Sequence, residues 1–168
     1  MSRITFSKLN SFIDNSFIDN KHGRLFCPIL IGFSLYLINY HLLKLIFYLY
    51  PATIALTVGK GSWWLSQSPL VKILYVGIFA PFFEEVIFRR GLLNWFILNE
   101  RFRLGLFISS TLFGFWHILF GWGILKAIDM MLIGIVFGLV YKKYQFKGSL
   151  LSHYSNNFLS LTFMLILV

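Results

Sequence analysis

Long hydrophobic runs separated by short polar stretches make up most of the chain after residue 24. Five runs can be followed, at residues 25–50, 70–98, 104–120, 127–141 and 149–168. None alternates apolar and polar positions as a half-buried strand does. A helix needs ~20 residues to cross the hydrocarbon core, and lipid tolerates only helices and closed barrels. The pattern therefore predicts an all-α fold, a polytopic transmembrane helix bundle of about five membrane helices.

The composition supports a membrane protein. Of the 168 residues, 58% are hydrophobic and 12% are charged, whereas a soluble domain is typically ~45–50% apolar and ~25% charged. A chain this short could not bury so much apolar surface in water. Cys27 is the single cysteine, so an internal disulfide framework is excluded. Soluble, disordered and disulfide-rich classes are thus poor descriptions of this sequence.

Three regions differ in character along the chain. Residues 1–24 form a polar tail that contains a short duplication, Ser-Phe-Ile-Asp-Asn, at 11–15 and 16–20. Residues 25–69 hold the first predicted membrane helix and a loop. Residues 70–168 hold the remaining runs and nearly all of the unusual polar residues, and we interpret them as one membrane core.

The net charge of +9 is distributed unevenly about the predicted helices. With five crossings, one side holds nine basic residues: Arg3, Lys8, Lys21, Arg24, Arg101, Arg103, Lys142, Lys143 and Lys147. The other side holds Lys60 and Lys126. Basic loops favour the cytoplasm, so we expect a multi-pass cell-membrane protein with a cytoplasmic N-terminus and an external C-terminus. The basic residues flank membrane segments rather than forming a separate basic face, so we expect lipid and no nucleic acid as partner.

Ionisable groups inside apolar runs are costly, and each is a candidate functional residue. The set comprises Glu84, Glu85, Arg89, Arg90, His117 and His153, with Asn156 and Asn157 beside the last. Glu85 and Arg89 are four residues apart and share a helical face, whereas Glu84 points about 100° away. His153 and Asn157 share a face in the same way, with Asn156 off it. An interfacial charge cluster, a histidine bonded to a neighbour and local helix capping are the structural alternatives.

Together these residues could form a hydrolytic site. A glutamate and a histidine can activate water as a general base and later protonate the leaving amine. A histidine and an asparagine can donate hydrogen bonds to a developing oxyanion. We therefore expect Glu84, His117, His153 and Asn157 to converge on one polar cavity. No Gly-x-Ser-x-Gly nucleophile motif and no His-Glu-x-x-His zinc motif occurs.

Three motifs resemble those of the CAAX protease and bacteriocin-processing (CPBP, or Abi) family of intramembrane proteases. Residues 84–89 match Glu-Glu-x-x-x-Arg, residues 113–117 match Phe-x-x-x-His, and residues 153–157 match His-x-x-x-Asn. Their order and spacing fit over roughly residues 70–168, and the resemblance implies that this range is the catalytic membrane core. Some members carry an asparagine four residues after the histidine of the second motif, where this chain has Gly121.

The resemblance implies a glutamic intramembrane protease that hydrolyses a peptide bond with activated water. It implies that Glu84 is the principal base, assisted by His117, that Glu85 and Arg89 support the site, and that His153 and Asn157 form the oxyanion hole. We expect no cofactor. The alternative is a divalent metal such as zinc, with Glu84, His117 and His153 as ligands.

The substrate is expected to be a peptide or protein, with a prenylated protein and a bacteriocin-type precursor as two options within the family. Two other functions stay open. One is a catalytically silent membrane scaffold or bacteriocin-immunity protein of the same family. The other is a small transporter that relays protons through Glu84 and His117, although the runs offer no clear inverted repeat.

Overall fold

The computed structural model describes residues 22–57 and 66–166. The proposed polar tail and its duplication lie outside the described residues, apart from the last three positions of residues 1–24. The described part is helical and contains no strand, which confirms the prediction of an all-α bundle. In chain order the elements are α2 (Gly23–Leu49), η1 (Pro51–Leu56), α3 (Pro69–Lys72), η3 (Ile73–Phe79), α4 (Ala80–Glu84), η4 (Glu85–Leu93), α5 (Asn94–Leu98), α6 (Phe102–Leu119) and α7 (Ile124–Ile166).

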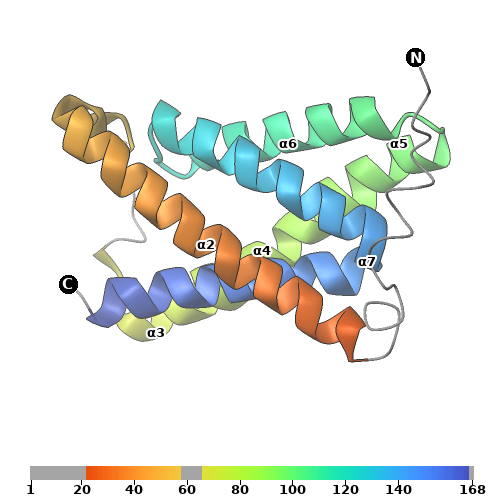
Figure 1. Ribbon diagram of the computed structural model, residues 1–168, viewed down its shortest axis with the longest axis horizontal. Helices are drawn as coiled ribbons and strands as arrows, with labels where there is room; N and C mark the ends of the chain where they lie inside the picture. Colours follow the sequence, from red (N-terminus) through yellow and green to blue (C-terminus); the bar gives the residue numbers. More distant parts are fainter. Residues whose placement is uncertain (1–21, 58–65, 167–168) are drawn as a thin grey trace, which may run out of the picture.

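The predicted runs correspond to five helical stretches. Elements α3 to α5 follow one another without a gap over residues 69–98, and α7 is two helices joined at Gln145, whose φ of 59° and ψ of −166° are not helical. Figure 1 shows the chain reversing direction there. By length and hydropathy, α2, α6 and α7 are candidate membrane spans among the described residues. The charged stretch 69–98 is not among them.

Helix α2 packs through small residues while its large apolar side chains face outward. Its buried positions are Gly23, Pro28 and Gly32. A Cβ on Gly32 would collide with the backbone carbonyl of Ser152 in α7, so glycine there permits close contact between the two helices. This is the usual way in which membrane helices associate, because lipid removes the hydrophobic driving force between them.

The stretch 69–98 begins as an ordinary capped α-helix, and parts of it then adopt the wider turns of a π-helix. Ser68 caps it by accepting from the Val71 backbone N–H, with proline at the next position. Residues 73–79 and 85–93 are π-helical, and the Ala80 N–H bonds the Tyr75 carbonyl five residues back. Such wide turns are rare and often occur at functional sites. Glu84 and Glu85 lie where the second wide segment begins.

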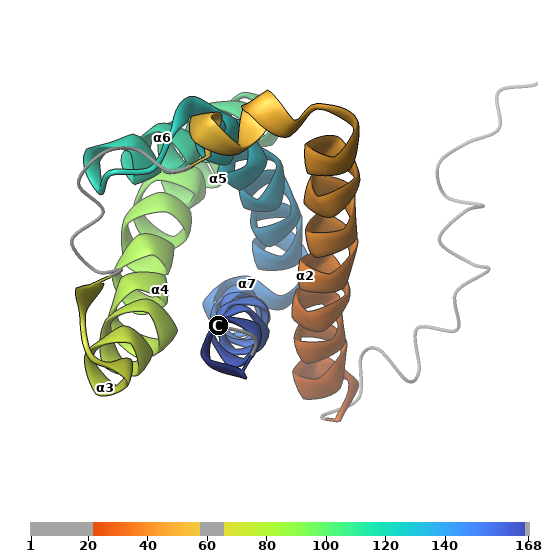
Figure 2. The same ribbon diagram turned by 90° about the vertical axis from the view of Figure 1, so that its left-hand side faces the viewer.

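The core sits among η4, α6 and the first half of α7. Its buried members are Phe88, Phe113, Met130, Ile133 and Phe137. The end-on view of Figure 2 shows the second half of α7 lying between α2 and the α3–α4 stretch. The candidate site residues therefore lie on this last helical half, which carries His153 and Asn157, and on the helices around it.

The two ends of the bundle carry different connections. One end holds the start of α2, the α5–α6 turn and the Gln145 break, and the other holds η1, the α6–α7 turn and the end of α7 (Figure 1). At the second end, the Gly123 N–H donates to the Thr57 carbonyl at 2.9 Å. The expected sidedness in the membrane stays a prediction, as does the division of the chain at residue 69.

Candidate active site

The two adjacent glutamates point to different surroundings. Glu85 is 0% exposed, and Glu84 is 8% exposed and lines a cavity. The Nε of Arg89 lies 3.6 Å from Oε1 of Glu85, which is the ion pair that the spacing of four predicts. The Ser149 hydroxyl donates to the other carboxylate oxygen of Glu85. Glu85 is thus held by several partners away from the cavity, while Glu84 faces it.

Arg89 is enclosed completely by the protein. Its Nη2 donates to the Gly134 carbonyl at 3.2 Å, and its guanidinium lies 4.3 Å from the ring centroid of Phe113 and 5.7 Å from that of Phe137. Aromatic faces attract such a cation. Arg90 lies apart from this group, because it is exposed and contacts the Phe146 ring.

His153 connects the two glutamates. Its Nδ1 donates to Oε1 of Glu85 at 3.0 Å, and its Nε2 lies 3.5 Å from Oε2 of Glu84. The ring stacks on Phe137 with a centroid distance of 4.4 Å. Because one nitrogen and one ring face are fixed by neighbours, the other nitrogen is directed at Glu84.

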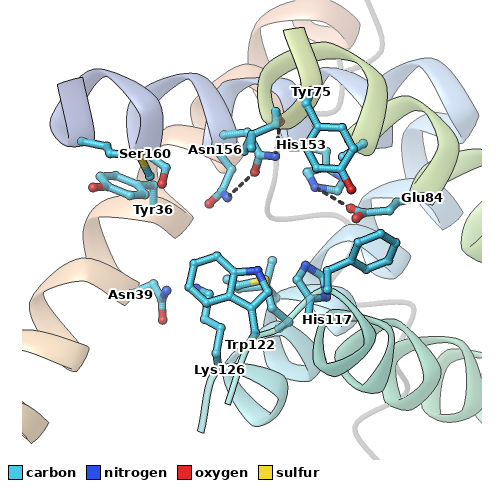
Figure 3. A pocket seen from close by; sticks show the side chains of 17 residues that line it. Tyr36, Asn39, Tyr75, Glu84, His117, Trp122, Lys126, His153, Asn156 and Ser160 are labelled. Atoms are coloured by element: carbon cyan, nitrogen blue, oxygen red, sulfur yellow. Dashed lines mark hydrogen bonds and ion pairs between the residues drawn. The ribbon is translucent and has the colours of Figure 1, made fainter. Parts of the chain in front are cut away.

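His117 approaches the same space from α6. Its Nδ1 donates to the Phe113 carbonyl at 2.8 Å, which leaves Nε2 as the acceptor nitrogen of a neutral ring. In Figure 3, His117 and Glu84 face the same space from different walls. A water between them would meet two groups able to accept its hydrogens.

The two asparagines of α7 both line the cavity. The Asn156 amide donates to Oδ1 of Asn157 at 3.2 Å, and the Asn157 amide donates to the Val76 carbonyl at 2.9 Å. In the π-helical register, residue 81 would donate to that carbonyl, and Pro81 has no N–H. Asn157 therefore satisfies a carbonyl that the proline leaves free, and its second amide hydrogen remains for another acceptor.

One cavity of about 160 Å³ brings the predicted groups together. Glu84, His117, His153 and Asn157 all line it, so their expected convergence is confirmed. The rest of the wall is supplied by Tyr36, Asn39, Tyr75, Val76, Ala80, Phe120, Trp122, Lys126, Met130, Ile133, Asn156, Ser160 and Met164. Glu85 and Arg89 lie behind this wall. The arrangement places a carboxylate, two imidazoles and three amides around a space that can hold water.

Comparison with known families matches the Rce1-like type II CAAX prenyl endopeptidases to residues 66–159 of the chain, which is more than half of its length. The chain belongs to this family. The matched range contains all seven residues that the three motifs specify, and the match confirms the resemblance to CAAX proteases. Comparisons with curated proteins and with solved structures gave no match.

Membership of the Rce1-like family supports a membrane protein and CAAX-type endopeptidase chemistry in general. The roles of individual residues are not tested by that match. A metal site was the alternative for Glu84, His117 and His153. Within residues 22–57 and 66–166, no group of three His, Cys, Asp or Glu side chains is arranged to hold a metal ion. We therefore derive no step through a metal.

Two polar residues near the Rce1-like site, Ser149 and Asp129, were not candidates in the sequence, and a third, Asn156, was named there without a role. Ser149 lies four residues before His153 on the same helical face, and that spacing was the available signal. Asn156 was placed off the active face, yet it lines the cavity. Asp129 is a buried carboxylate in the first half of α7, where it binds Lys126 and Asn39.

Proposed function

We propose that the chain is an intramembrane endopeptidase that hydrolyses a peptide bond with water activated by Glu84. The observation that carries this proposal is the cavity on which Glu84, His117, His153 and Asn157 converge. Glu84 is the carboxylate of its pair that faces this space, whereas Glu85 is engaged by Arg89, Ser149 and His153.

In the proposed reaction, a water between Glu84 and His117 Nε2 attacks the scissile carbonyl. Glu84 takes a proton from the water as the new C–O bond forms, and the carbonyl oxygen becomes an oxyanion. Asn157, with its remaining amide hydrogen, and the Nε2–H of His153 as an imidazolium paired with Glu85 are the proposed donors to that oxyanion. When the C–N bond breaks, Glu84 returns its proton to the leaving amine.

Arg89, Glu85 and Ser149 act through His153 in this scheme. The ion pair and the hydroxyl fix the Glu85 carboxylate, and that carboxylate fixes the imidazole through Nδ1. They are positioning residues, because neither Glu85 nor Arg89 lines the cavity. Such support normally determines how well a catalytic group keeps its geometry.

The test is hydrolysis of a fluorogenic membrane peptide by purified protein in detergent. Glu84→Gln keeps the size of the side chain and removes the base, so we expect activity to fall by ~10²–10⁴-fold while the folded yield is kept. A chelator should leave the native enzyme active. Full activity of Glu84→Gln would refute the assigned base, and chelator inactivation that zinc reverses would make these residues metal ligands. Absence of cleavage in every preparation would favour a silent family member.

A further inference from the structure

The cavity lies toward one end of the bundle only. From α2 it receives Tyr36 and Asn39, in the second half of that helix, and from α6 and the turn after it His117, Phe120 and Trp122. From α7 it receives positions 126–133 and 153–164, and from the stretch 69–98 it receives positions 75–84. Every one of these segments runs from the level of Glu84 and His153 toward the end that holds η1 and the α6–α7 turn. We call this the cavity end.

A closed layer separates the cavity from the opposite end. Glu85, Arg89, Phe113, Phe137 and Ser149 are all 0% exposed. They contact one another through the Glu85–Arg89 ion pair, the Ser149 hydrogen bond to Glu85 and the stacking of Arg89 on Phe113. Close-packed interiors leave few voids larger than a water molecule, so this layer gives a substrate no path from the far side.

Positive charge gathers at that opposite end, which we call the basic end. Among the described residues it holds seven cations: Arg24, Arg90, Arg101, Arg103, Lys142, Lys143 and Lys147. The cavity end holds three, Lys44, Lys72 and Lys126. Lys126 is also neutralised by Asp129, whose carboxylate lies 2.6 Å from its ammonium. Lysine and arginine in short membrane loops favour the cytoplasmic side.

From the cavity geometry and this charge distribution, we propose that the active site is reached from the outer side of the membrane. The proposal rests on the proposed function, and it defines the class of substrate. The scissile bond belongs to an exported peptide, or to a membrane-anchored precursor, at a position in the outer half of the bilayer. A prenylated C-terminus that stays in the cytoplasm cannot reach Glu84, because the closed layer and the basic end lie between them.

Cysteine labelling tests the sidedness without any assay of activity. Cys27 is replaced by alanine, which leaves a chain without cysteine. Ala52→Cys then marks the cavity end, at an exposed position of η1, and Asn99→Cys marks the basic end, at an exposed position after α5. Neither change removes a basic residue, so neither alters the charge bias that the proposal invokes. Intact bacterial cells are treated with a membrane-impermeant maleimide before and after permeabilisation.

We expect Ala52→Cys to be labelled fully before permeabilisation and Asn99→Cys only afterwards. The reverse pattern would overturn the proposal and open the cavity to cytoplasmic C-termini. Equal labelling of both positions from outside would also overturn it, since the chain would then insert in both orientations.

A second measurement separates this proposal from the proposed function. The cleavable peptide is supplied to right-side-out vesicles, to inside-out vesicles and to the same protein in detergent. We expect cleavage in detergent and in right-side-out vesicles, with loss in inside-out vesicles. Cleavage in inside-out vesicles alone would overturn the sidedness. No cleavage even in detergent would refute the peptidase and its substrate class, while the labelling pattern would still decide which way the cavity faces.

Discussion

Two clusters of buried charge in this molecule look alike by composition and differ in arrangement. At the site, Glu85 pairs with Arg89 four residues later on its own helical stretch and accepts from Ser149 and His153 of α7. Near the cavity end, Asp129 pairs with Lys126 three residues earlier and accepts from Asn39 of α2 at 3.3 Å. Each carboxylate thus has a cation on its own helix and a donor from another.

The clusters differ in how completely water is excluded. Both side chains of the Glu85–Arg89 pair are 0% exposed, whereas Lys126 is 20% exposed and Asp129 is 7% exposed. Removing the partner of a solvent-accessible charge costs the protein little stability. Removing the partner of a fully buried charge is strongly destabilising. We therefore expect the first pair to be essential to its surroundings, and the second, with its hydrogen bond from Asn39 of α2, to contribute less.

The site also contains a carboxylate that the other cluster lacks. Glu84 sits beside Glu85, but among the described residues its one ion-pair partner is His153, at 3.5 Å. A buried carboxylate with no cation bound to it is the less stable arrangement, and it is also the one that can accept a proton from water. The comparison suggests that the neutralised charges hold the structure and that the incompletely neutralised one carries the chemistry.

Removing the charge of Glu85 should have the largest effect on folding. Glu85→Gln leaves Arg89 buried without its partner, and we expect a loss of ~3–5 kcal/mol in the free energy of unfolding. Denaturation in mixed detergent micelles measures it. The matched control is the double variant Glu85→Leu with Arg89→Met, which replaces both charges by apolar groups and should recover much of the stability while staying inactive. Equal stability of Glu85→Gln and the native chain would show that the buried pair is not essential.

The prediction of the fold from sequence succeeded where a feature depends on one helix. Lengths of apolar runs gave the helical stretches, and the period of 3.6 residues gave the Glu85–Arg89 pair. Glu84 and His117 stood out because an ionisable group inside an apolar membrane segment is energetically costly and is therefore a candidate functional residue. The convergence of groups from separate helices was expected only because a hydrolytic site needs them together and the motifs resemble a protease family.

Features that depend on packing between helices could not be obtained in this way. Asn156 was named in the polar set but given no role, because it is about 100° from Asn157 on the helix, and a cavity bounded by several helices is wide enough to receive both. Ser149 looks like any helical serine until Glu85 is placed beside it. The link from Pro81 through the Val76 carbonyl to Asn157 requires the π-helical register, which no simple period reveals.

Asn157 gives the next largest expected effect, on activity. Asn157→Ala should reduce hydrolysis by ~10²–10³-fold if its amide donates to the oxyanion. It also frees the Val76 carbonyl, so a loss of ~1–3 kcal/mol in stability should accompany it. Asn156→Ala is the control, because Asn156 lines the same cavity but, within the part of the chain that the structure describes, donates to Asn157 alone. Equal loss of kcat in both variants would argue that the pair acts through structure, and the denaturation midpoints would show it.

Ser149 should have an intermediate effect through Glu85. Ser149→Ala removes a donor from a buried carboxylate that keeps Arg89 and His153, and we expect a loss of ~1–3 kcal/mol. Ser152→Ala is a matched control on the same helix, because the Ser152 hydroxyl is buried without a hydrogen-bond partner among the described residues. That variant should be neutral or slightly stabilising. The same denaturation series compares them, and equal losses would mean that the hydroxyl contact with Glu85 contributes nothing specific.

Replacement of Asp129 should have the smallest effect on stability and activity. It tests the comparison between the two clusters of buried charge most directly. Asp129→Asn keeps the size of the side chain and an oxygen for the Asn39 amide, while it removes the charge that binds Lys126. Since the lysine is partly exposed, its ammonium can turn to water, and we expect a change of ~1 kcal/mol or less in stability. Activity should stay within about tenfold of the native value. Purified Asp129→Asn and Glu84→Gln are compared in one hydrolysis assay, with KM and kcat determined separately. A loss of kcat as large as that of Glu84→Gln would place the second cluster in the catalytic machinery, and the distinction between neutralised and unneutralised carboxylates would then fail.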